Sequence, residues 1–217
     1  MKCIRFLINI SCYENINYDD IFKKYNRTMS EFLSYKEFKK LILISKYVAS
    51  DNTFKSIIDF CISNNIYDLE FIDTKFVTSF AYLFSYEKAS SLKISSWDTS
   101  NVTTMKGLFY NTEYEGEPIN VSKWDTSNVK DMSFMFSFST AICNGFSNWD
   151  MHNVETIESM FQYYVLNNVN LSKWDTSNVK IMKGLFKGCK IEDGTKLHIE
   201  NWDTSNVTNM ANMFSNF

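Results

Sequence analysis

The sequence predicts an α/β protein, built as a solenoid of short strands and short helices behind an N-terminal helical cap. Three observations support this fold class. A motif of the form Trp-Asp-x-x-Asn-Val occurs five times at nearly constant spacing. An apolar-x-apolar pair precedes four of these copies, and apolar residues three to four positions apart follow all of them. A fixed period of about 20–50 residues is typical of arrays in which each unit packs against its neighbours.

The motif divides the chain. Its copies begin at Trp97, Trp124, Trp149, Trp174 and Trp202, so successive copies are 27, 25, 25 and 28 residues apart. A degenerate sixth copy lies upstream, where Ile72-Asp73-Thr74 stands in place of Trp-Asp-Thr. We therefore expect a helical capping region over residues 1–66 and a solenoid of six repeats of about 25 residues over residues 67–217.

Each repeat combines two periodicities. The pair before the tryptophan, such as Leu92/Ile94, has a period of two and predicts a short strand. The segment after the motif, such as Met105/Leu108/Phe109, has a spacing of three to four residues and predicts a short helix or 3₁₀ turn. The Asp-Thr-Ser-Asn sequence between them has the short polar side chains of a turn and a helix N-cap.

A single repeat is too small to fold alone. Burying its one tryptophan and its few other apolar side chains does not offset the conformational entropy lost when about 25 residues become ordered. The repeats must therefore stack and share a core. We expect the tryptophans to form this structural core, namely Trp97, Trp124, Trp149, Trp174 and Trp202.

The strand positions four and two residues before each tryptophan are expected to point outward and to line the concave face of a sheet. This polar face is the candidate recognition surface. Its candidate residues are Lys93, Ser95, Asn120, Ser122, Asn170, Ser172, His198 and Glu200. Because it has no aromatic or arginine anchor, it suits a polar target, and an ordinary solvated face is the alternative.

Residues 17–65 have a helical pattern, with apolar residues three to four positions apart. We expect three amphipathic helices, with N-caps at Asp19 or Asp20, Ser34, and Asp51 or Asn52. These helices would cap the first repeat, and a separate binding function for them is the alternative. The strand near residues 197–200 is expected to have an open edge, which suggests edge-to-edge self-association at the C-terminal coil.

The full motif, Trp-Asp-Thr-Ser-Asn-Val-x-x-Met-x-x-Met/Leu-Phe, resembles the repeat of the BspA-like leucine-rich-repeat surface-protein family. The resemblance covers about residues 67–217. It implies a leucine-rich-repeat-like solenoid and suggests adhesion or protein recognition. It implies no enzymatic activity, and no site residue is transferred from it.

Composition and motif chemistry argue against several function classes. The net charge of −3 leaves no basic excess for nucleic acid, and no apolar run approaches the length of a membrane span. The five cysteines match neither a disulfide framework nor a zinc site. His152 and His198 lie in different parts of their repeats, without the orienting partner that base catalysis needs. We therefore expect a non-enzyme with no catalytic, cofactor-binding or metal-binding residues.

The expected function is non-enzymatic protein–protein recognition with an unknown protein partner. The alternatives are a surface adhesin that binds a host protein or glycan, and a structural repeat array with no specific ligand. A calcium-binding array is a further hypothesis, because each motif contains an aspartate, although turn capping explains the same residues. The N-terminal residues lack a signal-peptide pattern, which favours an intracellular location, with a surface or secreted location as the alternative.

Overall fold

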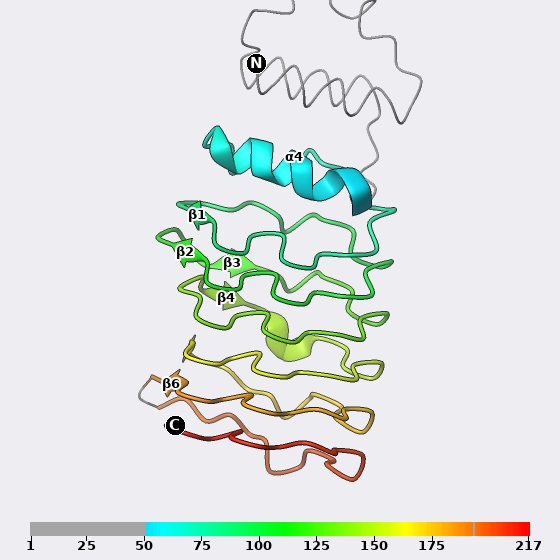
Figure 1. Cartoon of the computed structure of the whole chain (residues 1–217), viewed down its shortest axis with the longest axis vertical. Helices are drawn as coiled ribbons and strands as arrows, with labels where there is room; N and C mark the ends of the chain where they lie inside the picture. Colours follow the sequence, from blue (N-terminus) through cyan, green and yellow to red (C-terminus); the bar gives the residue numbers. More distant parts are fainter. Residues whose placement is uncertain (1–50, 193) are drawn as a thin grey trace, which may run out of the picture.

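The computed structural model describes residues 51–192 and 194–217. Helix α4 (Asp51–Ser63) lies at one end, and the repeats follow it as layers stacked one on the next (Figure 1). The helices predicted before residue 51 lie outside the described residues, so the division into residues 1–66 and 67–217 stays a prediction. Within the described ranges, no helix is both long and apolar enough to cross a membrane.

The predicted fold class, an α/β leucine-rich-repeat-like solenoid of short strands and short helices behind a helical cap, is wrong. Among the described residues α4 is the one α-helix, and it precedes the repeats. The repeats consist mostly of turns and isolated bridges, with one 3₁₀ helix, η1 (Phe146–Asn148). Their strands are two residues long and form three separate two-stranded parallel sheets rather than one continuous sheet. The pairs are β1 (Lys88–Ala89) with β2 (Glu113–Tyr114), β3 (Ile119–Asn120) with β4 (Cys143–Asn144), and β5 (Val165–Leu166) with β6 (Lys190–Ile191).

The predicted helices do not form because the backbone amides of that segment bond the next layer. The Phe80 N–H donates to Thr104 O at 2.9 Å, and the Tyr82 N–H donates to Lys106 O at 2.8 Å. A helix would direct these amides to carbonyls four residues earlier in the same segment. The intervening Leu83 N–H closes a turn onto Phe80 O at 3.3 Å. Successive turns therefore produce the three-to-four spacing that resembles a helical period.

The strands also differ from the prediction in position and register. The sheets β1–β2 and β5–β6 lie after the repeat phenylalanine, whereas the predicted strands precede the tryptophan. In the β3–β4 pair, Asn120 lies opposite Asn144, whereas the spacing from the tryptophans predicts Gly145. Gly145 has a left-handed φ of 93° and accommodates the additional residue before Trp149.

The layers are held in parallel register by a line of single bridges along the stack. Each bridge joins one layer to the next at the same place in the repeat, through Ser79, Thr104, Asp131, Thr156, Ile181 and Asn209.

An unbroken column of phenylalanine rings runs through the interior. Its successive ring centroids are 5.5–5.8 Å apart, and neighbouring rings are within 14° of parallel. This column is the continuous aromatic contact between layers, because each ring packs on the ring one repeat later. The rings belong to Phe84, Phe109, Phe136, Phe161, Phe186 and Phe214.

The tryptophans lie beside this column and bond the preceding layer. Four of them are 3–4% exposed, and Trp202 is half-buried. Every indole N–H donates to a carbonyl of the layer before it, at 3.0–3.2 Å. The rings stack directly in the pairs Trp124–Trp149 and Trp174–Trp202. Between the other neighbouring tryptophans a phenylalanine ring packs against both indoles, Phe80 against Trp97 and Trp124, and Phe146 against Trp149 and Trp174.

The aspartate of each motif closes a short turn rather than capping a helix. In the Trp97 repeat, Asp98 Oδ1 accepts the Ser100 N–H at 3.0 Å and the Ser100 hydroxyl at 2.6 Å. This is an Asx turn, in which a side chain satisfies a backbone amide two residues later. The hydrogen bonds from Ser100 hold the pKa of Asp98 below its usual range.

The turn bonds predict a loss of stability in acid. The pKa of Asp98 is lower in the folded state than in the unfolded state. At pH values above the unfolded pKa of about 3.9, the ionised carboxylate therefore stabilises the fold in full. This contribution is lost as the pH falls through the pKa of the folded state. Asp98→Ala should therefore lower the melting temperature at pH 7 more than at pH 3. Thermal melts of both proteins at the two pH values test this. An equal difference at both would show that the carboxylate charge contributes nothing.

Candidate functional site

The predicted recognition residues lie on short segments that no single sheet joins. Lys93, Asn120, Ser122, Asn170, Ser172 and Glu200 are exposed, while Ser95 and His198 are half-buried. Several of their polar groups are used locally. The Asn120 and Asn170 side chains accept the N–H groups of Ser122 and Ser172 at 3.0 and 2.9 Å, and the Ser95 hydroxyl donates to Glu70 at 2.7 Å.

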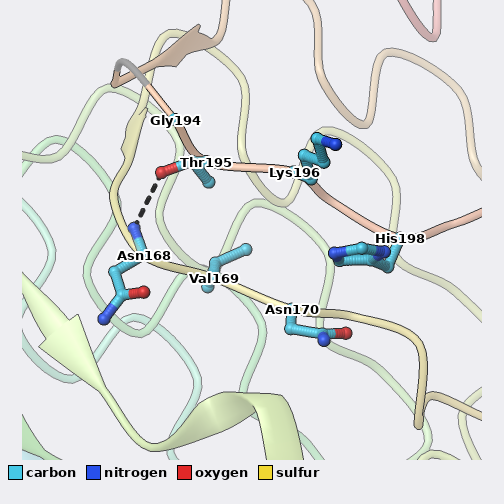
Figure 2. Close-up of a pocket in the computed structure, with 7 residues that line it drawn as sticks. All are labelled: Asn168, Val169, Asn170, Gly194, Thr195, Lys196 and His198. Carbon is cyan, nitrogen blue, oxygen red and sulfur yellow. Dashed lines mark hydrogen bonds between the residues drawn. The ribbon is translucent and has the colours of Figure 1, made fainter.

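Asn170 and His198 come together at an open hollow between the segments 168–170 and 194–198 (Figure 2). The Asn168 N–H donates to Thr195 Oγ1 at 3.0 Å and ties the two segments together. The hollow has a volume of about 240 Å³, below the roughly 300–1,000 Å³ of typical small-molecule sites. Its size and openness do not support a buried ligand.

The cysteines of the described region are buried, and they lack the properties of reactive thiols. Burial raises the pKa of Cys61 and of Cys189 to about 12, and it raises the pKa of Cys143 as well. These thiols are therefore protonated at neutral pH, whereas a nucleophile or metal ligand must be a thiolate. Within 51–192 and 194–217, no group of three or more His, Cys, Asp or Glu side chains is placed to hold a metal ion. The motif aspartates in these ranges are therefore not gathered into such a group.

Six aromatic side chains form an exposed stripe across neighbouring layers. We call this set the aromatic stripe: Tyr82, Tyr86, Tyr110, Phe134, Phe138 and Tyr163. Four of them are 41–69% exposed, and Tyr110 and Phe134 are half-buried. The Tyr110 ring contacts three of the others at centroid distances of 5.3–6.4 Å, and Phe138 stacks on Tyr163 at 4.8 Å. Five of the six rings are therefore in contact with one another, and the sixth, Tyr82, lies against Gly107 of the next layer.

Five residues of the stripe have a left-handed backbone. The φ values of Tyr82, Tyr86, Phe134, Phe138 and Tyr163 are 54–60°. The equivalent positions in the other layers have the same backbone and are filled mainly by small or turn-forming residues, namely Gly107, Asn111, Ser159, Gly184, Gly188, Asn212 and Asn216. A bulky side chain in this region costs about 1–3 kcal/mol, whereas glycine adopts it freely. The aromatic residues thus occupy positions where other residue types fit with less strain.

Two glycines fix the orientation of rings at the ends of the stripe. A Cβ added at Gly107 would lie 2.3 Å from Tyr82 Cε1, and one added at Gly188 would lie 2.3 Å from Tyr163 Cε1. Both tyrosine rings therefore lie directly against the backbone of the next layer. This contact leaves one face of each ring covered and holds the ring in place.

Sequence reasoning missed the stripe because it predicted a short helix or 3₁₀ turn after each motif from the apolar positions alone and gave the stripe positions no role. A signal was present in the aligned repeats. The position before Leu83 is tyrosine, but glycine fills it at Gly107 and Gly184. Alternation of glycine with large aromatic residues at one position indicates a left-handed backbone with exposed rings.

A family profile described as "Mycoplasma protein of unknown function, DUF285" matches residues 49–166 and 137–217. The two overlapping matches span α4 and the layers that follow it. Searches of curated proteins and of solved structures found no match. Because the matched residues make up more than half of the sequence, the chain belongs to the family described as Mycoplasma protein of unknown function, DUF285.

Proposed function

We propose that this protein is a non-enzymatic recognition protein that binds a protein partner through the aromatic stripe. The observation that supports this is the presence of five large rings at left-handed positions, where they are partly exposed. Backbone strain of this kind persists where the surrounding structure or a function requires the residue. A purely structural array would gain stability from glycine or asparagine at the same positions.

The chemistry of the stripe suits a protein interface. Tyrosine and other aromatic residues are enriched among the residues that dominate binding energy. Rings already held by their neighbours lose little conformational freedom on binding. The entropy cost of ordering them therefore offsets less of the energy gained from contact with the partner. The predicted polar face around Asn120 and Asn170 offers no comparable anchor, since its side chains close local turns.

The test replaces three rings of the aromatic stripe by residue types found at the equivalent left-handed positions of other layers. In Tyr86→Asn/Phe138→Asn/Tyr163→Gly the fold should be retained, because asparagine and glycine occupy equivalent positions at Asn111 and Gly188. Removal of three anchors worth at least about 1 kcal/mol each should weaken partner binding at least about 100-fold. Quantitative affinity purification, with the partner identified by mass spectrometry and its affinity then measured with purified protein, provides the readout.

The matched control alters the face predicted from the sequence, as Lys93→Glu/Asn120→Glu/Asn170→Glu. This variant should keep the partner. Loss of the partner in the control alone would reject the stripe as the binding surface. Binding of a glycan, with no protein captured by wild type, would instead favour the adhesin alternative.

A further inference from the structure

The aromatic stripe belongs to a set of outward positions that recurs in successive layers. In the first turn segment, Phe80, Leu83 and Phe84 are buried, whereas residues 81–82 and 85–86 are exposed or half-buried. We call these four positions and their equivalents in the next four layers the aromatic face, because they include every residue of the stripe. The aromatic face consists of residues 81–82, 85–86, 106–107, 110–111, 133–134, 137–138, 158–159, 162–163, 183–184 and 187–188.

The aromatic face has an excess of positive charge. Its charged residues are three lysines and one glutamate, namely Lys106, Lys183, Lys187 and Glu158. The glutamate is paired, because Lys183 Nζ lies 3.1 Å from Glu158 Oε1. The ammonium groups of Lys106 and Lys187 form no ion pair or hydrogen bond with any residue that the structure describes. The face therefore has two uncompensated positive charges, although the net charge of the whole chain is −3.

These two lysines lie next to the rings at the two ends of the stripe. Lys106 directly precedes Gly107, against whose backbone the Tyr82 ring lies. Lys187 has the same relation to the Tyr163 ring, through the glycine that follows it. Both lysines are half-buried, as expected when the apolar stem of a lysine packs on the surface and its ammonium group stays in water. Free positive charge and exposed aromatic area therefore coincide at both ends of the stripe.

We propose that the aromatic stripe binds an acidic polypeptide segment in which two carboxylate side chains flank apolar ones. This inference rests on the proposed function and specifies the chemistry of the partner. The carboxylates pair with Lys106 and Lys187, and the apolar side chains cover the exposed rings between them. Complementary charges at the edge of an interface raise the association rate and select the partner, whereas buried aromatic anchors provide most of the affinity.

The same charges argue against a nucleic acid as the ligand. Bases also stack on aromatic rings, but single strands bind where a row of cations follows the phosphate backbone. On the aromatic face, the free cations are limited to Lys106 and Lys187 at its two ends. A protein segment can have its charges as widely spaced as these two lysines.

The positions of the two lysines set the length of the segment. Lys106 and Lys187 belong to layers three repeats apart. Parallel neighbours lie about 4.8 Å apart, so the two backbones are separated by at least about 14 Å. An extended chain advances about 3.3 Å per residue, so five residues span about 16 Å. Acidic residues five positions apart therefore reach both lysines.

The test measures the binding of synthetic peptides to the full chain by fluorescence anisotropy. The acidic peptide has glutamate at its first and sixth positions, with phenylalanine and tyrosine between them. A basic peptide has lysine in place of both glutamates, and a polar peptide keeps the glutamates but has glycine and serine between them. We expect the acidic peptide to bind with a Kd below about 1 mM, at least about 10-fold more tightly than either of the others. Added salt should weaken its binding, because salt screens exposed charges.

The decisive variant is Lys106→Glu/Lys187→Glu, which should weaken binding of the acidic peptide at least about 10-fold. The matched control, Lys93→Glu/Lys123→Glu, changes the net charge equally at exposed positions outside the aromatic face and should bind as wild type does. Thermal melts show whether both variants are folded. Failure of wild type to bind the acidic peptide, equal affinity for the acidic and basic peptides, or unchanged binding by the Lys106/Lys187 variant would overturn the proposal. So would tighter binding of single-stranded oligothymidylate than of the acidic peptide.

The ring variant Tyr86→Asn/Phe138→Asn/Tyr163→Gly separates this inference from the proposed function. If the ring variant loses the acidic peptide while the Lys106/Lys187 variant keeps it, the acidic character of the partner is wrong and the proposed function stands. If the Lys106/Lys187 variant loses the peptide while the ring variant keeps it, the lysines bind without the stripe and the proposed function fails.

Discussion

Replacing Trp174 by alanine is expected to lower the free energy of unfolding by about 3–5 kcal/mol, the range for removing a buried aromatic side chain. The Trp174 ring is 3% exposed and lies 6.1 Å from both the Phe161 and the Trp202 rings. Its indole N–H donates to Phe146 O at 3.1 Å. Because each layer contacts only its neighbours, this loss would weaken the stack at an interior layer, and we expect unfolding to become less cooperative. Urea unfolding followed by circular dichroism provides the measurement.

The same residue type in the last described layer provides a matched control. Trp202 makes an equivalent hydrogen bond, to Leu171 O at 3.1 Å, but its ring is only half-buried. Trp202→Ala should therefore cost less than half as much as Trp174→Ala, because less apolar area returns to water. Equal losses at the two positions would show that the interior location of Trp174 contributes nothing.

The repeat period was predictable because spacing and apolar character are local properties of a sequence. The bridges from Ser79 to Thr104 and from Thr104 to Asp131 follow the repeat spacing along the chain. The direction of the backbone amides was not predictable in the same way. A helix and a series of turns both place apolar residues three to four positions apart, so Phe80 and Leu83 fit either. Only the bond from the Phe80 N–H to Thr104, in the next layer, distinguishes them.

The candidate site was hidden for a related reason. A prediction of strand alternation assigns Asn120 and Asn170 to an outward face, and both are exposed. It gives no account of positions such as Tyr86 and Phe138, whose exposure depends on a left-handed backbone. Glycine and asparagine at the aligned positions indicate this backbone, but aromatic residues do not. The aligned repeats indicate the left-handed backbone through Gly107 and Gly184, but the contacts that join the rings into the aromatic stripe are evident only in the structure.

At the N-terminal end of the described layers, α4 takes the place of a preceding layer. Asp51 at the start of the helix accepts the Thr78 N–H at 2.7 Å and the Ser79 N–H at 3.0 Å, which satisfies donors of the first layer. Lys55 Nζ donates to Leu83 O at 2.9 Å, which satisfies an acceptor. The Phe54 ring lies 5.5 Å from Phe80, in the interior of the first layer. One helix turn thus supplies a donor, an acceptor and an aromatic ring.

Phe54→Ala should therefore destabilise the protein by about 3–5 kcal/mol, because it removes a ring that is 1% exposed and packs against both Phe80 and Trp97. Hydrogen exchange should show the loss first in the amides of residues 77–86, since the first layer depends on α4 for its cover. Ser56→Ala, at an exposed position of the same helix, should change the free energy of unfolding by less than about 0.5 kcal/mol. If Phe54→Ala instead increased exchange uniformly along the stack, α4 would be one part of a single cooperative unit rather than the cover of its first layer. Faster exchange confined to residues 77–86 would instead show that the first layer opens while the remaining layers stay folded.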